Sequence, residues 1–161
     1  AGVEAADGCA SSTRGIISGG SNPSSAYNTI SYVTIASTGD TTDFGDMSES
    51  RWTFGVGSNA TRGIFSGGRT PAGGEGVDTM DYITIATLGN STDFGNLTDN
   101  RSACDAVTSP TRYVTGGGYN PGNVNIIDYV EIMTTGNAVD FGDLTYGRSR
   151  SGSCSNAHGG L

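Results

Sequence analysis

The segment TRGIISGG at residues 13–20 decides the architecture, because it returns as TRGIFSGG at residues 61–68 and as TRYVTGGG at residues 111–118. Each copy is followed by a tyrosine, then by an Asp-Phe-Gly segment, and then by an arginine. Four landmarks in one order, at a spacing of roughly 50 residues, mark a repeat protein. The recurring residues are Tyr32, Tyr82 and Tyr129; Asp43, Asp93 and Asp140; Phe44, Phe94 and Phe141; and Arg51, Arg101 and Arg148.

Each repeat unit contains four short segments with strand character. In the second unit they lie near residues 52–59, 63–66, 79–86 and 93–97, where β-branched and aromatic residues recur between turn residues. The Gly67–Gly68 pair ends the second segment, where glycine permits positive φ or the close approach of another backbone. The pattern predicts an all-β fold made of four-stranded antiparallel sheets.

Such a thin sheet cannot bury its faces alone, so neighbouring units must cover one another, as the blades of a β-propeller do. We place three units at residues 1–49, 50–99 and 100–147, and the first strand of a further unit at residues 148–161. The chain is then a single repeat domain or a fragment of one.

Composition narrows the range of functions. Only 34% of the 161 residues are hydrophobic and 27 are glycine. This composition is unsuited to a helix bundle or a membrane-spanning helix. The chain has eight cationic residues, all arginine, and sixteen carboxylates, so its net charge is −8. Because nucleic acids and anionic membranes bind clustered positive charge, we expect neither as a partner.

The succession Gly67–Gly68, Tyr82, Phe94 and Arg101 resembles the kelch repeat. In that repeat a Gly-Gly pair ends the second strand, a tyrosine lies in the third, and an aromatic residue and an arginine follow. The chain departs from the pattern by carrying phenylalanine where kelch blades usually carry tryptophan. The resemblance covers nearly the whole chain and implies a galactose-oxidase-like β-propeller of about six or seven blades, used mostly for binding.

The TGNxxDFGDLT block resembles tandem repeats in virion structural proteins of tailed bacteriophages. This resemblance implies a structural part in a tail, fibre or decoration protein, a virion or extracellular location, and other virion or surface proteins as partners. The alternative is a glycan-binding, lectin-like propeller on a cell or virus surface.

Three units do not close a ring readily, because known propellers use about 4–8 blades. We expect the chain to be part of a longer repeat chain. The alternative is a homo-oligomer, in which two chains form one ring by two-fold symmetry. Residues 149–158 repeat what residues 3–12 already supply, and this redundancy argues against the dimer.

The sequence offers few groups for catalysis, and we predict no enzymatic activity, no cofactor and no metal site. His158 is the one histidine, so a copper site, a catalytic triad and a histidine-based zinc site all lack residues. Asp40, Asp43 and Asp46 do not have the spacing of a calcium loop and are assigned to turn closure. Three cysteines are interpreted as small buried residues: Cys9, Cys104 and Cys154.

The recurring arginines are predicted to pair inside the protein with the repeated carboxylates Asp43, Asp93 and Asp140. The loops between the second and third strands, at residues 21–28, 69–78 and 119–125, differ most between units. Polar loops on a rigid scaffold are a natural place for contact with a protein or glycan partner. The candidate binding residues in these loops are Tyr27, Arg69, Glu75 and Tyr119.

Overall fold

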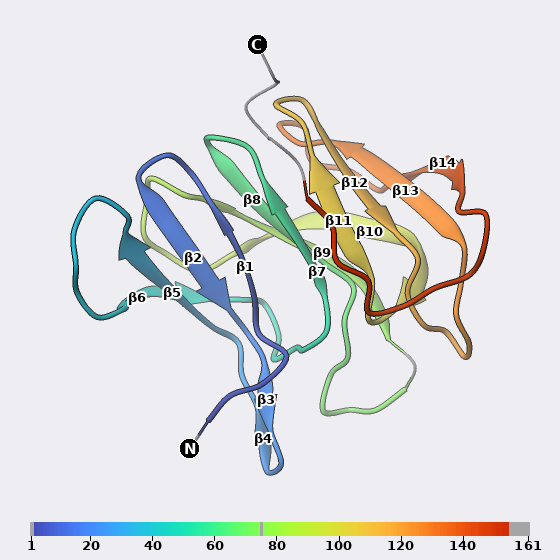
Figure 1. The fold of residues 1–161 in the computed structure, drawn as a ribbon, viewed down its shortest axis with the longest axis horizontal. Coiled ribbons are helices and arrows are strands. Elements are labelled where there is room, and N and C mark those ends of the chain that lie inside the picture. Colours follow the sequence, from blue (N-terminus) through green and yellow to red (C-terminus); the bar gives the residue numbers. More distant parts are fainter. Residues whose placement is uncertain (1, 75, 155–161) are drawn as a thin grey trace.

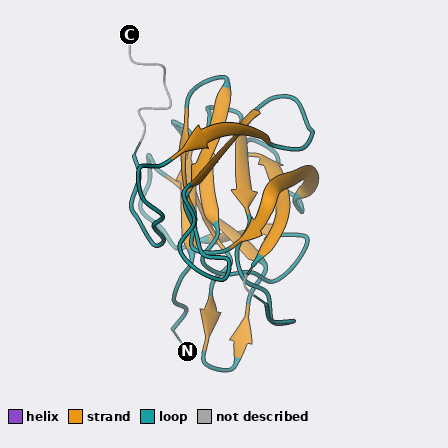
Figure 2. Cartoon of the chain, turned by 90° about the vertical axis from the view of Figure 1, so that its right-hand side faces the viewer, coloured by secondary structure: helices purple, strands orange, loops and turns teal. Residues whose placement is uncertain are grey.

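The computed structural model describes residues 2–74 and 76–154, and these residues form strands, turns and loops with no helix (Figure 2). The prediction of an all-β fold is confirmed. Within the described ranges no helix is long and apolar enough to cross a membrane.

Three four-stranded antiparallel sheets follow one another along the chain (Figure 1). The first contains β1 (Asp7–Ala10), β2 (Arg14–Ser18), β5 (Thr29–Thr34) and β6 (Thr42–Asp46). The second contains β7 (Gly55–Ser58), β8 (Arg62–Ser66), β9 (Val77–Thr84) and β10 (Thr92–Arg101). The third contains β11 (Asp105–Thr108), β12 (Arg112–Gly116), β13 (Ile126–Glu131) and β14 (Val139–Asp143), and a small hairpin pairs β3 (Ser21–Asn22) with β4 (Ser25–Ala26).

The strands of the second sheet lie close to the segments predicted from the sequence. The exception is β7, which begins at Gly55 rather than near Trp52, because Thr53 has a φ of 53° and turns the chain out of the extended conformation. At the other end β10 runs past residue 99 to Arg101, which pairs with Val77 of β9 after a shift in register.

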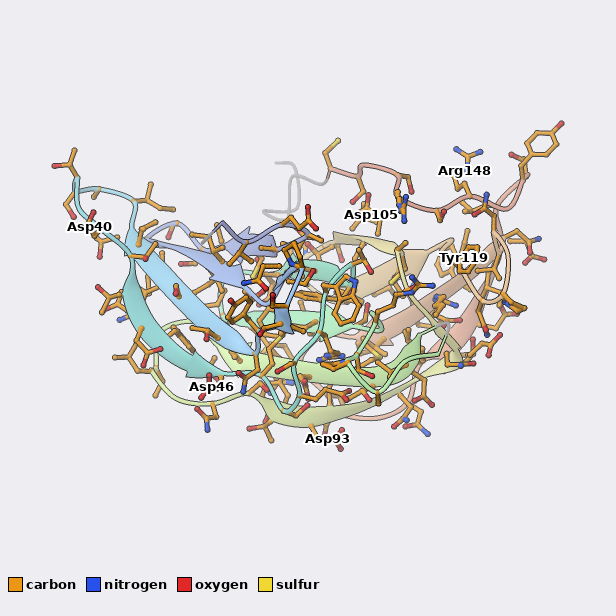
Figure 3. The ribbon with its side chains drawn as sticks, turned by 90° about the horizontal axis from the view of Figure 1, so that it is seen from below. Asp40, Asp46, Asp93, Asp105, Tyr119 and Arg148 are labelled. Carbon is orange, nitrogen blue, oxygen red and sulfur yellow. The ribbon has the colours of Figure 1, made fainter. Side chains whose placement is uncertain are left out.

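The sheets lie side by side, with the first strand of each at the centre. Both β1 and β11 pack against β7. The fourth strands lie on the outer rim, where Asp46 and Asp93 are found, and the described residues fan out between Asp40 at one end and Arg148 at the other (Figure 3). They form an open arrangement of three sheets and not a closed ring.

A chain of backbone hydrogen bonds links the units near their first strands. Thr53 N donates to Ala5 O (3.4 Å), Ala103 N to Thr53 O (2.6 Å) and Arg150 N to Ala103 O (2.9 Å). All four residues have φ between 53° and 56°, a conformation that L-residues adopt at a cost. Its recurrence shows that the bonds between units fix the backbone here.

The repeat of the backbone therefore extends to Arg150, but no strand forms between residues 148 and 154. Ser153 Oγ donates to Asp105 Oδ1 (2.7 Å) and Ala106 O (2.6 Å), so this segment lies along β11. Residues 155–161, with His158, lie outside the described residues. A first strand of a further unit at residues 148–161 thus stays a prediction.

Two apolar clusters hold the sheets together, one at each junction. At the first junction residues in or next to β2, β5 and β6 meet residues in or next to the strands of the second sheet: Ile16, Ile30, Phe44 and Met47 against Phe54, Val56, Phe65, Ile83 and Ile85. At the second junction Ile64, Met80, Phe94 and Leu97 meet Ala106, Val130 and Ile132, which are equivalent to residues of the first junction, and Tyr113, which stands where the second unit has Gly63. Burial of these side chains between sheets is the main stabilising contribution.

The sequence predicts that the recurring arginines pair internally with Asp43, Asp93 and Asp140, and these predicted partners are wrong. These aspartates are exposed on the outer strands. Instead, a fully buried ion pair joins Arg51 Nη2 to Asp81 Oδ2 at 2.5 Å, and another joins Arg101 Nη2 to Asp128 Oδ2 at 2.9 Å. Each arginine reaches the carboxylate directly before the third-strand tyrosine, because that residue faces the inside of the junction.

A second set of arginines lies over the tyrosine rings of the third strands, at 4.7, 4.0 and 5.0 Å from the ring centroids for Arg14–Tyr32, Arg62–Tyr82 and Arg112–Tyr129. Each tyrosine also makes an edge-to-face contact with the phenylalanine of the Asp-Phe-Gly segment, with ring centroids 5.7–6.1 Å apart. Each tyrosine–phenylalanine pair is therefore reinforced by a cation–π contact from an arginine of the second strand.

Candidate functional site

The variable loops lie at the lower end of the molecule in Figure 1, below the three sheets. At residues 67 and 68 the two glycines have φ of 64° and 103°, and a Cβ at Gly67 would lie 2.5 Å from Arg101 O. This confirms the expected close approach of another backbone. Because the same contact recurs in each unit, the loop that follows always starts beside the next unit.

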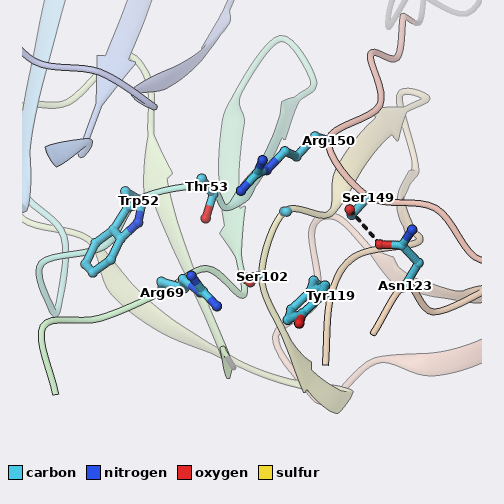
Figure 4. A pocket seen from close by; sticks show the side chains of 9 residues that line it. Trp52, Thr53, Arg69, Ser102, Tyr119, Asn123, Ser149 and Arg150 are labelled. Carbon is cyan, nitrogen blue, oxygen red and sulfur yellow. Dashed lines mark hydrogen bonds between the residues drawn. The ribbon is translucent and has the colours of Figure 1, made fainter. Parts of the chain in front are cut away.

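A pocket of about 390 Å³ opens at this end, between the second and third sheets and residues 149–150 (Figure 4). Its lining combines aromatic rings, guanidinium groups, hydroxyls and an amide: Trp52, Thr53, Arg69, Ser102, Ala103, Tyr119, Asn123, Ser149 and Arg150. A concave surface with a few polar groups aimed into it is the usual form of a ligand site.

Backbone pairing fixes the lining. Trp52 and Arg69 exchange two backbone hydrogen bonds of 3.1 and 2.9 Å, and Ser102 and Tyr119 exchange two of 3.2 and 2.7 Å. In both pairs the residue after a recurring arginine is held beside the residue after a Gly-Gly pair. Rigid backbone therefore presents positions whose side chains change from unit to unit.

The side chains offer hydrogen-bond donors and ring faces. The Arg69 guanidinium carbon lies 5.8 Å from the centroid of the Tyr119 ring, and Ser149 Oγ donates to Asn123 Oδ1 at 2.8 Å. Trp52 and Asn123 lie at opposite ends of the lining, and Arg150 lies between them (Figure 4). This combination can hold a polar ligand by stacking and hydrogen bonding.

The structure brings together two of the predicted binding residues, Arg69 and Tyr119. Tyr27 lies outside the pocket, directly after β4, and its hydroxyl is 2.5 Å from Asn22 Nδ2 in β3. Glu75 lies outside the described residues. The assignment of these four residues to binding stays a prediction.

Sequence reasoning missed Trp52, Asn123 and Arg150. A signal for the first was present, because the residue after the recurring arginine is not constant: it is Trp52 in one unit but Ser102 and Ser149 in the others. Asn123 belongs to a loop that was recognised as variable, but no pattern singled it out.

Two titratable groups with shifted pKa values lie in the junctions, away from this pocket. Burial raises the pKa of the Cys9 thiol to about 12, although a hydrogen bond from Ser58 opposes the shift. Burial likewise raises the pKa of Tyr113 well above its usual value, and its hydroxyl shares a hydrogen bond of 2.5 Å with Ser66 Oγ. A neutral thiol is a poor nucleophile, so Cys9 has a packing role.

The other cysteines differ in exposure from the prediction that all three are buried. Cys104 is buried and Cys9 is half-buried, but Cys154 is exposed, because no strand forms around it. Among the described residues no group of three or more His, Cys, Asp or Glu side chains could hold a metal ion.

No protein-family model matches this chain, and a search of curated proteins finds no match.

Proposed function

We propose that the chain is a segment of a kelch-like β-propeller and acts as a non-enzymatic structural or binding module. The strand order of the three sheets supports the propeller, because the first strands lie together at the centre and the fourth strands lie outermost. The residues that recur serve the junctions, as the buried Arg51–Asp81 and Arg101–Asp128 pairs do.

The observation that carries the proposal is the contrast between the constant frame and the variable pocket. Trp52 and Ser102 occupy equivalent positions, as do Arg69 and Tyr119, and all four line one cavity. Repeat proteins recognise partners through such varied positions on a common scaffold. The resemblance of the Asp-Phe-Gly block to phage repeats favours a place in a virion tail, fibre or decoration protein.

Glycan binding is a second candidate, favoured by the chemistry of the pocket. Trp52 and Tyr119 offer apolar ring faces, and Asn123 and Arg69 offer donors and an acceptor close by. A sugar ring presents one apolar face and a rim of hydroxyls, and this arrangement suits it.

The test measures binding of the labelled chain to a glycan array and to purified virion and surface proteins. Trp52→Ala and Tyr119→Ala should each weaken binding at least about tenfold, the effect of losing roughly 1.4 kcal/mol of contact. Tyr146→Ala, which removes an exposed ring outside the pocket, is the matched control. Binding that is equally strong in Trp52→Ala and Tyr119→Ala would show that the pocket is not the site.

A further inference from the structure

Each sheet has a forward face, which we define as the four apolar residues turned toward the next sheet along the chain. In the first two sheets these residues are buried in the junction clusters. The equivalent residues of the third sheet have no sheet in front of them among the described residues. The three sets are Ile16, Ile30, Phe44 and Met47; Ile64, Met80, Phe94 and Leu97; and Val114, Ile127, Phe141 and Leu144.

The forward face of the third sheet is an open apolar surface. Phe141 is 54% exposed, whereas Phe44 is 3% and Phe94 is 2% exposed. Val114, Ile127 and Leu144 line a groove of about 270 Å³. The third sheet therefore has the apolar surface of an interior junction, but no described sheet covers that surface.

The second-strand arginines also differ between the first two sheets and the third. Arg14 Nη1 and Arg62 Nη1 each donate to a backbone carbonyl of the following sheet, Ile85 O at 2.7 Å and Ile132 O at 3.1 Å. Their equivalent, Arg112, instead pairs with Glu131 of its own sheet at 3.1 Å, and both side chains are half exposed.

Arg148 shows most clearly that the third sheet has the residues of a junction without a following sheet in the part of the chain that the structure describes. Its carbonyl accepts from Gly118 N at 2.8 Å, as Arg101 O accepts from Gly68 N at 2.9 Å, so its backbone already has the position of a junction arginine. Arg101 is fully buried against Asp128, but Arg148 is exposed. What the junction lacks is a carboxylate from a following third strand.

The glycines of the outer strands show the same difference between the first two sheets and the third. A Cβ on Gly95 would clash with Gly136 O of the next sheet, and a Cβ on Gly45 would clash in the same way with Gly89 O. Gly142, the equivalent in β14, has no atom within 4 Å of that position among its described neighbours. The glycine needed for close approach is present, and the approaching turn is not.

From these observations we propose that the forward face of the third sheet binds one further unit of this same repeat, which carries an aspartate directly before its third-strand tyrosine. That aspartate accepts from Arg148, a carbonyl at the end of the same strand accepts from Arg112, and the turn after it contacts Gly142. The two junctions already formed in the chain supply every one of these contacts.

The first sheet of a second copy does not fit this role. Its residue before the third-strand tyrosine is Ser31, and the position equivalent to the arginine is Val3, so neither charge of the pair is present. In addition, Ser153 bonds to β11, so residues 148–154 already lie where β1 of a second copy would have to pack. The inference is independent of what the pocket binds.

The test is a fusion in which residue 154 is followed by a second copy of residues 108–154, which supplies a fourth unit with its own Asp128. Hydrogen exchange of residues 139–143 is compared with that in the parent chain. We expect exchange at Phe141 and Gly142 to slow at least tenfold, and one cooperative unfolding transition at higher urea concentration.

The matched control is the same fusion with Asp128→Ser in the appended copy only, which should lose most of the gain. Phe141→Asp should lower the midpoint of the fusion much more than that of the parent chain. An appended copy that stays unfolded, or that folds while exchange at residues 139–143 is unchanged, would overturn the proposal. So would a parent chain that sediments as a dimer with those residues protected.

Discussion

The second and third sheets have nearly the same pattern of residues but different surroundings, and the comparison separates what the sequence repeat determines from what a neighbour determines. Phe94 and Phe141 both make an edge-to-face contact with the tyrosine of their own sheet. Only Phe94 is buried, because the third sheet covers it. The repeat therefore builds each sheet, and the next sheet in line supplies the burial that stabilises it.

The largest expected effect compares those two phenylalanines. Phe94→Ala removes a buried aromatic ring from the second junction and should lower the free energy of unfolding by about 3–5 kcal/mol. Phe141→Ala removes an exposed ring and should cost less than about 1 kcal/mol. Urea denaturation of both variants measures the difference. Equal losses would mean that burial at the junction does not stabilise the second sheet.

Next in size is the buried ion pair. Asp128→Asn keeps the shape of the side chain but removes the charge facing Arg101, and it weakens the bonds that Thr98 donates to the same carboxylate. We expect a loss of about 2–3 kcal/mol by the same measurement. Arg148→Met, which alters the exposed equivalent of Arg101, is the control and should change stability by less than about 0.5 kcal/mol. A similar loss in both variants would contradict the distinction.

The two junctions also differ in their titratable groups, Cys9 at the first and Tyr113 at the second. Their raised pKa values keep both groups neutral in the folded chain at a pH at which the unfolded chain ionises them. Stability should therefore fall as pH rises, from 9.0 toward about 12 for Cys9 and above 10.0 for Tyr113.

The slope should reach at most about 1.4 kcal/mol per pH unit for each group. Denaturation between about pH 8 and 10.5 measures it, and Cys9→Ala and Tyr113→Phe should each flatten the curve. If both variants kept the parent slope, other groups would be responsible for the alkaline loss.

The smallest expected effect concerns the outer rim. Asn90 Oδ1 accepts from Asp46 N at 3.0 Å and ties the second sheet to the first. Asn90→Ala should cost about 0.5–1.5 kcal/mol, whereas Asp40→Ala, at the equivalent position with no sheet before it, should be nearly neutral. Thermal unfolding of both variants decides this. A larger effect of Asp40→Ala would indicate a contact on the open side of the first sheet.

Much of the fold could be predicted from the sequence because the repeat itself encodes it. The Gly-Gly pair, the third-strand tyrosine and the Asp-Phe-Gly segment recur in register, and strand positions follow from them. The partner of the recurring arginines could not be predicted in this way. Asp93 and Asp81 are both carboxylates in strands of one unit, and only the packing of the junction distinguishes the exposed one from the buried one.

The pocket was predicted only in part for a similar reason. Arg69 and Tyr119 were found because their loops differ between units. Trp52 belongs to a segment predicted as strand, and its role depends on backbone pairing with Arg69 across the chain. Pairing between distant segments has no local signal in a single sequence.

Hydrogen exchange of the turns between third and fourth strands tests the central claim most directly, namely that each unit is stabilised by the sheet beside it. Gly89 N and Ser91 N donate to Phe44 O and Asp46 O, and Gly136 N and Ala138 N donate to Phe94 O and Asn96 O. We predict that these four amides exchange at least about tenfold more slowly than Gly39 and Thr41, which occupy the equivalent turn of the first sheet. Equally fast exchange in all three turns would contradict the account.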